Sequence, residues 1–434
     1  MTRAATTDGV YELPDRIARG ALGIALLLAL GACSEQVTSS LGCPELCSDQ
    51  SATLRDTLLT DAVVFDTTLT GYPQLGTTRE LSLVARGDTA DSRIVARFDT
   101  LPSTYVPATA QADSAIAFVD SATMIFVVDT TFVRPTTAVT IDAYDVDTTA
   151  ADTNADAVIP LFRPDRLIGS TTFQPAQVRD TLRLQLSNDA LLAKIQAKAR
   201  LRVGLKLRDG SFPTLRVSGS AFTPRIRFRT STDSTVAPDT IQLTSLTPTD
   251  DPVVASGLAL YPVIAAGVLP PPPQDFLAVG GMNGARSYLR FLIPPIVLDS
   301  VQVIRASLEL TQRAPRSAGG SGDTITVLTS AILAGPSITD VKTELNFLAP
   351  TNSFPIDTLR VVPGQDLIRR VEIVNLVRAW RVVGADKATR ALVLTAAQEG
   401  TSPGEIDFYS SDAPADVRPR LRLTYVPRRG FGIP

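Results

Sequence analysis

The stretch TLRLQL, Thr181–Leu186, alternates polar and apolar side chains with a period of two. Successive side chains of a strand point to opposite faces of a sheet, so this alternation is typical of a strand with one buried face. Proline and glycine separate further segments of the same kind. These segments are RLRVGLKL (Arg200–Leu207), RIRFRT (Arg225–Thr230), ASLELTQ (Ala306–Gln312), TITVLT (Thr324–Thr329) and RLRLTY (Arg420–Tyr425). Many short strands predict an all-β protein made of antiparallel β-sandwiches.

Two short stretches predict helices instead. SNDALLAKIQAKA begins with a candidate N-cap at Ser187 or Asn188, followed by apolar residues at helical spacing. IVNLVRAWRVV places Val377 and Trp380 one helical turn apart. Trp380, the single tryptophan, therefore lies on an apolar stripe, and we interpret it as a core anchor rather than a ligand platform.

Four landmarks recur in the same order, at spacings of 184 to 195 residues. We therefore predict two tandem β-sandwich domains, residues 53–235 and 236–434, each with a short helix, joined near the low-complexity segment 231–240. The landmark pairs are Arg97-Phe98 with Arg290-Phe291, SATMIF (Ser121–Phe126) with RASLEL (Arg305–Leu310), the strand-to-helix turn at Asn188 with that at Asn375, and TPRIRF (Thr223–Phe228) with RPRLRL (Arg418–Leu423).

The second copy resembles the DNRLRE domain family, which is similar to carbohydrate-binding module family 96. The resemblance covers about Leu258 to Val426 and rests on SYLRF, RASLEL, VEIVNLVRAW and RPRLRLTYV. The first copy is also similar to surface lipoproteins that carry domains of unknown function. The resemblance implies jelly-roll-like sandwiches and, in some members, polysaccharide binding or a role as a surface or stalk module.

The N-terminal segment contains an apolar run, Ala21–Leu30, with Arg16 and Arg19 on its N-terminal side. As a helix this run reaches only ~15 Å, about half of a bilayer core, so we interpret it as part of a secretory signal. LGAC at Leu30–Cys33 resembles the bacterial lipobox. The resemblance implies cleavage before Cys33, lipidation of its thiol, a signal peptide at 1–32 and a tether at 33–52. The lack of Asp after Cys33 favours the outer membrane.

Other residue types narrow the chemistry further. Export to an oxidising compartment predicts a disulfide between Cys43 and Cys47, with free thiols as the alternative. The chain has no histidine, which removes the imidazole base of Ser-His-Asp and Cys-His catalysis. The formal net charge is −3 with both signs interspersed, whereas a nucleic-acid surface would show a basic stripe. We therefore expect neither an enzyme nor a nucleic-acid partner.

Two sets of residues are candidates for ligand binding. Asp152, Asn154 and Asp156 match the first alternate ligands of a calcium loop, but the turn glycine and distal glutamate are missing. A solvated acidic loop is therefore the favoured interpretation, with structural calcium as the alternative and no other cofactor expected. Tyr261, Tyr288 and Tyr409 are candidates for stacking on sugar rings. Asp145 and Asp147 are too close in sequence for a glycosidase pair, and turn chemistry explains them.

The sequence therefore predicts a lipid-anchored envelope protein, facing the periplasm or the outside from the outer membrane. The leading hypothesis is a non-catalytic binding or structural module, with polysaccharide as the expected ligand class. The alternatives are a protein-docking component of an envelope assembly and a carboxylate-dependent glycan hydrolase or lyase.

Overall fold

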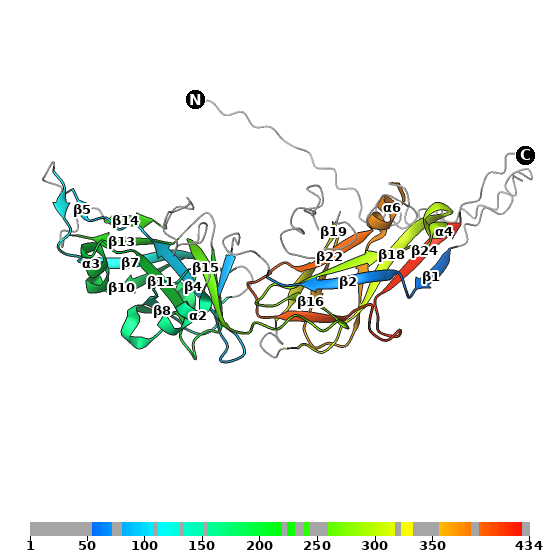
Figure 1. Cartoon of the computed structure of the whole chain (residues 1–434), viewed down its shortest axis with the longest axis horizontal. Coiled ribbons are helices and arrows are strands. Elements are labelled where there is room, and N and C mark those ends of the chain that lie inside the picture. The colour runs from blue at the N-terminus through cyan, green and yellow to red at the C-terminus, as the bar shows by residue number, and fades with distance from the viewer. Residues whose placement is uncertain are drawn as a thin grey trace, which may run out of the picture. The chain divides into compact units, whose positions relative to one another are not determined.

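The computed structural model describes residues 54–71, 80–106, 112–130, 134–151, 154–218, 224–230, 238–242, 259–316, 323–332, 356–382 and 390–427 (Figure 1). Residues 53–434 form one compact unit. The signal, the tether, Cys33, Cys43 and Cys47 lie outside the described residues. Within the described ranges, no helix has the length and apolar character needed to span a bilayer. Strands dominate, so the all-β prediction is confirmed.

The strands form two lobes, each with its own hydrophobic core. The first lobe contains β3 (Glu80–Ala85), β4 (Asp91–Phe98), β5 (Thr104–Tyr105), β6 (Ser114–Ala115), β7 (Ser121–Asp129), β8 (Val139–Asp145), β9 (Leu167–Phe173), β10 (Thr181–Leu186), β11 (Leu201–Leu207), β12 (Thr214–Ser218), β13 (Arg225–Arg229), β14 (Asp239–Gln242) and β15 (Leu260–Ala266). Its helices are α2 (Ala155–Val158) and α3 (Asn188–Gln196), with single 3₁₀ turns at Ile159–Leu161, Pro164–Arg166 and Pro175–Gln177.

The second lobe is built from both ends of the described chain. It contains β1 (Arg55–Leu59), β2 (Val63–Leu69), β16 (Phe276–Gly280), β17 (Arg286–Phe291), β18 (Val301–Thr311), β19 (Ile325–Ile332), β20 (Asp357–Val361), β21 (Ile368–Glu372), β22 (Ala391–Ala396), β23 (Glu405–Tyr409) and β24 (Arg420–Pro427), with helices α4 (Pro295–Asp299) and α6 (Val374–Val382). One sheet has the order β1-β24-β18-β21, another β2-β17-β22-β19-β20, and β16 pairs with β23. All of these pairings are antiparallel.

In the first lobe eight strands form a closed barrel in the order β10-β9-β8-β11-β4-β3-β12-β7, and the pairing of β7 with β10 closes it. Three of the strand pairings in this barrel extend over only one or two residue pairs. The joint between β9 and β10 is the single pair Gly169–Leu186. A Cβ on Gly169 would lie 2.3 Å from the carbonyl oxygen of Gln185, so the close approach of these strands requires glycine.

The predicted repeat appears in the strand pairing. β7 pairs with β10 and β13, and β18 pairs with β21 and β24 in the same way. β11 lies between β4 and β8, as β22 lies between β17 and β19. The four sequence landmarks fall on β4 and β17, β7 and β18, α3 and α6, and β13 and β24. The two lobes therefore share one topology.

The predicted domain boundary does not match the pairing. β1 and β2, expected in the first domain, pair with β24 and β17 of the second lobe. β14 and β15, expected in the linker and second domain, pair with β13 and β4 of the first lobe. Figure 1 shows β1 and β2 beside the C-terminal strands. Each copy thus gives its first two strands to the other lobe.

The helix predictions are confirmed. Ser187 caps α3, because its hydroxyl oxygen accepts a hydrogen bond from the Ala190 amide at 3.2 Å. Leu191 and Ile195 of this helix are buried in the core of the first lobe. In the second lobe Trp380 is 5% exposed, and its ring centroid lies 5.5 Å from that of Phe291. Trp380 is therefore the core anchor that its apolar stripe predicts.

Candidate functional site

Two of the three predicted stacking tyrosines are buried, so that prediction is wrong for them. Tyr261 on β15 is 1% exposed and Tyr288 on β17 is 2% exposed. Each packs among aliphatic side chains in a small satellite core. Tyr409 at the end of β23 is partly exposed, but the Arg313 guanidinium lies 4.9 Å from its ring centroid. The tyrosines therefore do not form a common binding platform.

The candidate calcium residues do not form a cation site within the part of the chain that the structure describes. Asp152 lies outside the described residues. Asn154 caps α2, with its side-chain oxygen 3.1 Å from the Ala157 amide that donates to it. Asp156 lies in the first turn of that helix, where a carboxylate suits the helix dipole. Searched over the described residues alone, the chain has no group of three or more acidic or cysteine side chains arranged around a metal position.

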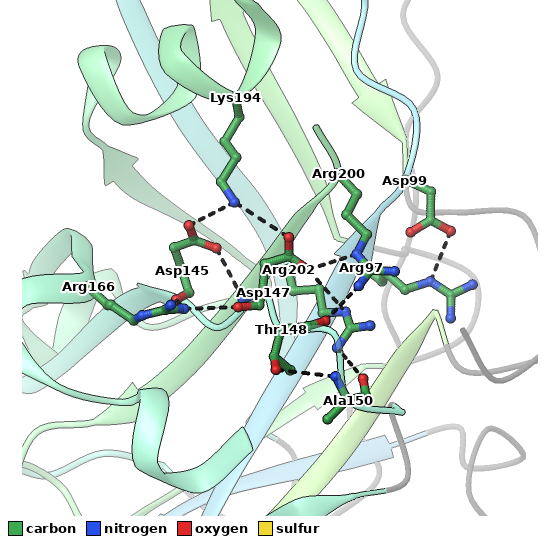
Figure 2. Close-up of polar contacts among 10 residues, drawn as sticks. All are labelled: Arg97, Asp99, Asp145, Asp147, Thr148, Ala150, Arg166, Lys194, Arg200 and Arg202. Carbon is green, nitrogen blue, oxygen red and sulfur yellow. Dashed lines mark hydrogen bonds and ion pairs between the residues drawn. The ribbon is translucent and has the colours of Figure 1, made fainter. Parts of the chain in front are cut away.

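Asp145 and Asp147, at and just beyond the end of β8, lie in a network of ion pairs (Figure 2). Lys194 from α3 is 2.9 Å from Asp145 Oδ2, and Arg200 Nε is 2.8 Å from Asp147 Oδ1. Arg166 donates to the backbone carbonyls of Asp145 and Asp147, both at 3.0 Å. The Asp147 amide also donates to Asp145 Oδ1 at 3.2 Å, which is the predicted turn chemistry.

This network joins separate elements rather than opening onto a ligand space. Arg202 is 0% exposed, and its Nε lies 3.6 Å from Asp147 Oδ1. The neighbouring cavity, between α3 and the ends of β10 and β11, holds only about 20 Å³. That is roughly one water molecule. We therefore interpret the network as structural: its ion pairs and hydrogen bonds hold α3 and the loop after β8 against the end of the barrel.

A larger cavity, which we call the arginine pocket, has a volume of about 400 Å³, within the usual range for small-molecule sites. Loops and strand ends of both lobes contribute to it. Most of the lining residues have polar side chains, and one phenylalanine and two prolines complete the lining. The lining residues are Arg86, Phe212, Pro213, Thr214, Arg216, Asp323, Thr324, Thr326, Arg360, Gln398, Thr401, Ser402 and Pro403.

A clamp between Arg86 and Asp323 forms one wall of the arginine pocket. Arg86 Nη1 and Nη2 donate to the two carboxylate oxygens of Asp323 at 3.0 and 3.1 Å. Nη2 also donates to Thr214 Oγ1 at 3.0 Å. The Ser82 hydroxyl donates to the Thr401 carbonyl nearby. A bidentate arginine–carboxylate pair fixes geometry as well as charge, so this wall of the pocket is held in place.

Two further guanidinium groups line the arginine pocket. Arg216 is 6% exposed, and burial lowers the pKa of its guanidinium, with Glu80 3.8 Å away. Arg360 is an exposed residue of β20, and its guanidinium makes no hydrogen bond or ion pair with any residue that the structure describes. The described part of the lining thus holds three guanidinium groups and the single carboxylate of Asp323, which suits an anionic or polyhydroxylated ligand.

A buried acid pair lies on β23, close in sequence to Thr401, Ser402 and Pro403 of the pocket. Glu405 is 7% exposed and Asp407 1% exposed. Arg316 forms ion pairs with both carboxylates: its Nη2 lies 2.7 Å from Glu405 Oε1 and its Nε lies 3.3 Å from Asp407 Oδ1. Burial, reinforced by Asp407, raises the pKa of Glu405 to about 7. Burial also raises the pKa of Asp407.

The arginine pocket and the acid pair were missed at the sequence level. The pocket residues come from several separate segments, and none of these segments matches a known binding motif. Glu405 and Asp407 alternate on a strand, EIDFY, in which apolar Ile406 and Phe408 are also buried. Polar residues at alternate positions of a strand are typical of a solvated face, whereas the ion pairs with Arg316 accompany burial of both faces of β23.

No family model matches this chain, and no curated protein matches it. Among solved structures, a "putative secreted protein" from Parabacteroides distasonis ATCC 8503 aligns over 85% of this chain and 99% of its own length, with 10% identity and a TM-score of 0.23. The tandem CBM22 domains of Paenibacillus barcinonensis Xyn10C align over 86% and 91%, with 9% identity and a TM-score of 0.12. These similarities are too low to support an argument about function.

Proposed function

We propose that this chain is a non-catalytic, lipid-anchored module of the bacterial cell envelope that binds an acidic polysaccharide in the arginine pocket. The observation that carries the proposal is the pocket lining, which combines three arginines with hydroxyl and amide side chains around about 400 Å³. Guanidinium groups bind carboxylates or phosphates, while threonine, serine and glutamine exchange hydrogen bonds with sugar hydroxyls. A saccharide unit that bears an acidic group offers both.

Arg360 supports the acidic ligand class. It is an exposed residue in the lining of the arginine pocket. A guanidinium binds a carboxylate or phosphate through charge-assisted hydrogen bonds, which are stronger than those between neutral groups. An acidic sugar unit at Arg360 would gain such bonds, and the threonine, serine and glutamine side chains of the same lining offer partners for its hydroxyls.

The proposed anchor rests on the LGAC sequence before and at Cys33. Two or three acyl chains hold a protein firmly at a membrane, since each buried CH₂ contributes about 0.8 kcal/mol. The proposed location is the outer membrane, on its periplasmic or outer side. An anchored module with a fixed pocket would attach envelope polysaccharide to the membrane.

The non-catalytic part of the proposal rests on the carboxylates. Among the described residues that line the pocket, Asp323 is the one carboxylate, and both of its oxygens accept hydrogen bonds from Arg86. Glycan hydrolysis by carboxylates needs two such groups on either side of the bond that is cleaved. Glu405 and Asp407 form a pair, but both are buried and bound to the same arginine. We therefore keep hydrolase or lyase activity as the least favoured alternative.

A protein-docking role is the second candidate, and exposed apolar side chains favour it. Leu292 is 62% exposed and Ile296, at the start of α4, is 69% exposed. Exposed apolar groups close together often mark contacts with other proteins. Substitution of both by Ser would then weaken crosslinking to envelope proteins and leave polysaccharide binding unchanged.

Binding of polygalacturonate and of neutral dextran to the purified chain tests the proposal. We expect polygalacturonate to bind and dextran not to bind. Arg360→Ala should weaken polygalacturonate binding about tenfold, which is about 1.4 kcal/mol. Arg227→Ala is the matched control, because Arg227 is also an exposed strand arginine but lies on β13, outside the pocket lining. Equal losses in the two variants, or equal binding of both polymers, would contradict the proposed pocket.

A further inference from the structure

The positions occupied by β2 and β15 are equivalent. On β17, Thr67 of β2 lies opposite Tyr288, two residues before Arg290. On β4, Tyr261 of β15 lies opposite Val95, two residues before Arg97. Arg97 and Arg290 are matching landmarks of the repeat, so β2 and β15 lie against the same segment of the receiving strand in the two lobes. In each lobe the equivalent strand, β17 or β4, therefore pairs with a strand that the other sequence repeat supplies.

The strands that fill this position in the second lobe lie at sheet edges. β1 ends the sheet β1-β24-β18-β21, and β2 ends the sheet β2-β17-β22-β19-β20. An edge strand can leave without breaking any other strand pairing, and the edge that it uncovers can pair with another chain. The described chain after β2 resumes at Glu80 in the first lobe, so β1 and β2 are joined to the rest of the second lobe only through the first lobe.

The contacts of β1 and β2 are specific to the second lobe. Val63 is 6% exposed in its core. Thr57 Oγ1 lies 3.3 Å from the Tyr425 hydroxyl. After β1, Asp61 Oδ1 is 3.0 Å from Arg418 Nη1. A second copy of the chain carries the same residues, so its β1 and β2 can make each of these contacts with no change in chemistry.

We propose that the edges of β24 and β17 form an exchange site for a second copy of this chain, whose β1 and β2 replace the chain's own strands and give a strand-exchanged dimer. Within one chain, the two sequence repeats already exchange their first two strands. Each lobe therefore accepts a pair of strands that its own repeat does not supply. Domain swapping costs little because the exchanged contacts are identical to those of the monomer. The balance then depends on chain concentration during folding.

The test exploits the pair Asp61–Arg418, whose side chains are 79% and 30% exposed, so that substitution leaves the core intact. Full chains with Asp61→Arg and with Arg418→Asp carry different affinity tags and are unfolded and refolded together. Within each variant, positions 61 and 418 then have like charges. In an exchanged heterodimer the two substituted positions face each other with opposite charges, and native Asp61 faces native Arg418.

We expect the mixed variants to co-purify a few-fold more than tagged wild-type chains refolded together, since an exposed pair contributes up to about 1 kcal/mol. A chain that carries both substitutions should co-purify only as much as wild type, because its own pair is restored. Equal co-purification of mixed variants and wild type, or co-purification when the variants are refolded apart and then mixed, would overturn the exchange site. Far-ultraviolet circular dichroism of each variant confirms that it is folded.

Discussion

Substitution of Glu405 by Gln is predicted to change how stability depends on pH. The pKa of Glu405 is raised from 4.5 to about 7 by burial and by Asp407. Between these values the folded state binds more protons than the unfolded state, so unfolding becomes easier as pH rises. At about 1.36 kcal/mol per pH unit, this difference in pKa lowers the free energy of unfolding by an amount on the order of 3 kcal/mol between pH 4.5 and 7. The stabilisation is complete below pH 4.5 and is lost above about pH 7.

Urea unfolding at pH 5 and at pH 8, followed by the fluorescence of Trp380, measures this effect in the second lobe. We expect the wild-type chain to lose stability between the two values. Glu405→Gln cannot titrate, so its stability should fall less over the same range. Hydrogen bonding of Glu405 to Arg316 keeps the loss smaller than burial alone would give. A variant that follows the wild-type pH curve would refute the reasoning.

Glu309→Gln is the control with the opposite sign. Burial would raise the pKa of Glu309, but hydrogen bonds from Arg422 and Arg370 lower it. The stability that Glu309 contributes is therefore present at neutral pH and is lost as pH falls through the folded-state pKa. The cost of Glu309→Gln should be larger at pH 8 than in acid, whereas the cost of Glu405→Gln should be larger at pH 5.

Three further predictions concern the fold and the anchor. Gly169→Ala should lower the free energy of unfolding by about 1–3 kcal/mol, measured by urea titration, because its Cβ would meet the Gln185 carbonyl; an unchanged midpoint would show that the joint is loose. Deletion of residues 54–71 should shift Trp380 emission towards the exposed wavelength, since β1 and β2 complete the second lobe, and unshifted emission would refute their placement. Cys33→Ser should leave an unprocessed precursor without lipid label, and normal labelling would exclude lipidation at this residue.

Period-two alternation predicted six of the strands, namely β10, β11, β13, β18, β19 and β24. RLRLTY became β24, with Leu421 and Leu423 buried and Arg422 outside. The repeat was visible because both copies keep the same landmarks at the ends of equivalent strands. The N-cap at Ser187 was predictable from local chemistry alone, since capping depends on neighbouring residues.

Strand partners were not predictable in the same way. β1 lies beside β24, and Thr57 meets Tyr425 across 368 positions of sequence. Alternation shows which face of a strand is buried, but it does not identify the neighbouring strand. The same limit explains Tyr261, whose burial comes from packing on Val95, Val146 and Val158 in the first lobe. The arginine pocket depends on loops of both lobes, so it could only follow from the arrangement of the strands.

Hydrogen exchange of the full chain, measured by mass spectrometry with and without polygalacturonate, tests the proposed function most directly. The account predicts slower exchange of backbone amides in the segments 212–216, 323–326 and 398–403, which line the arginine pocket. The network around Asp147 and the remaining strands should exchange at the same rate in both samples. Binding of the polymer with no change in these three segments, or with protection elsewhere, would contradict the account.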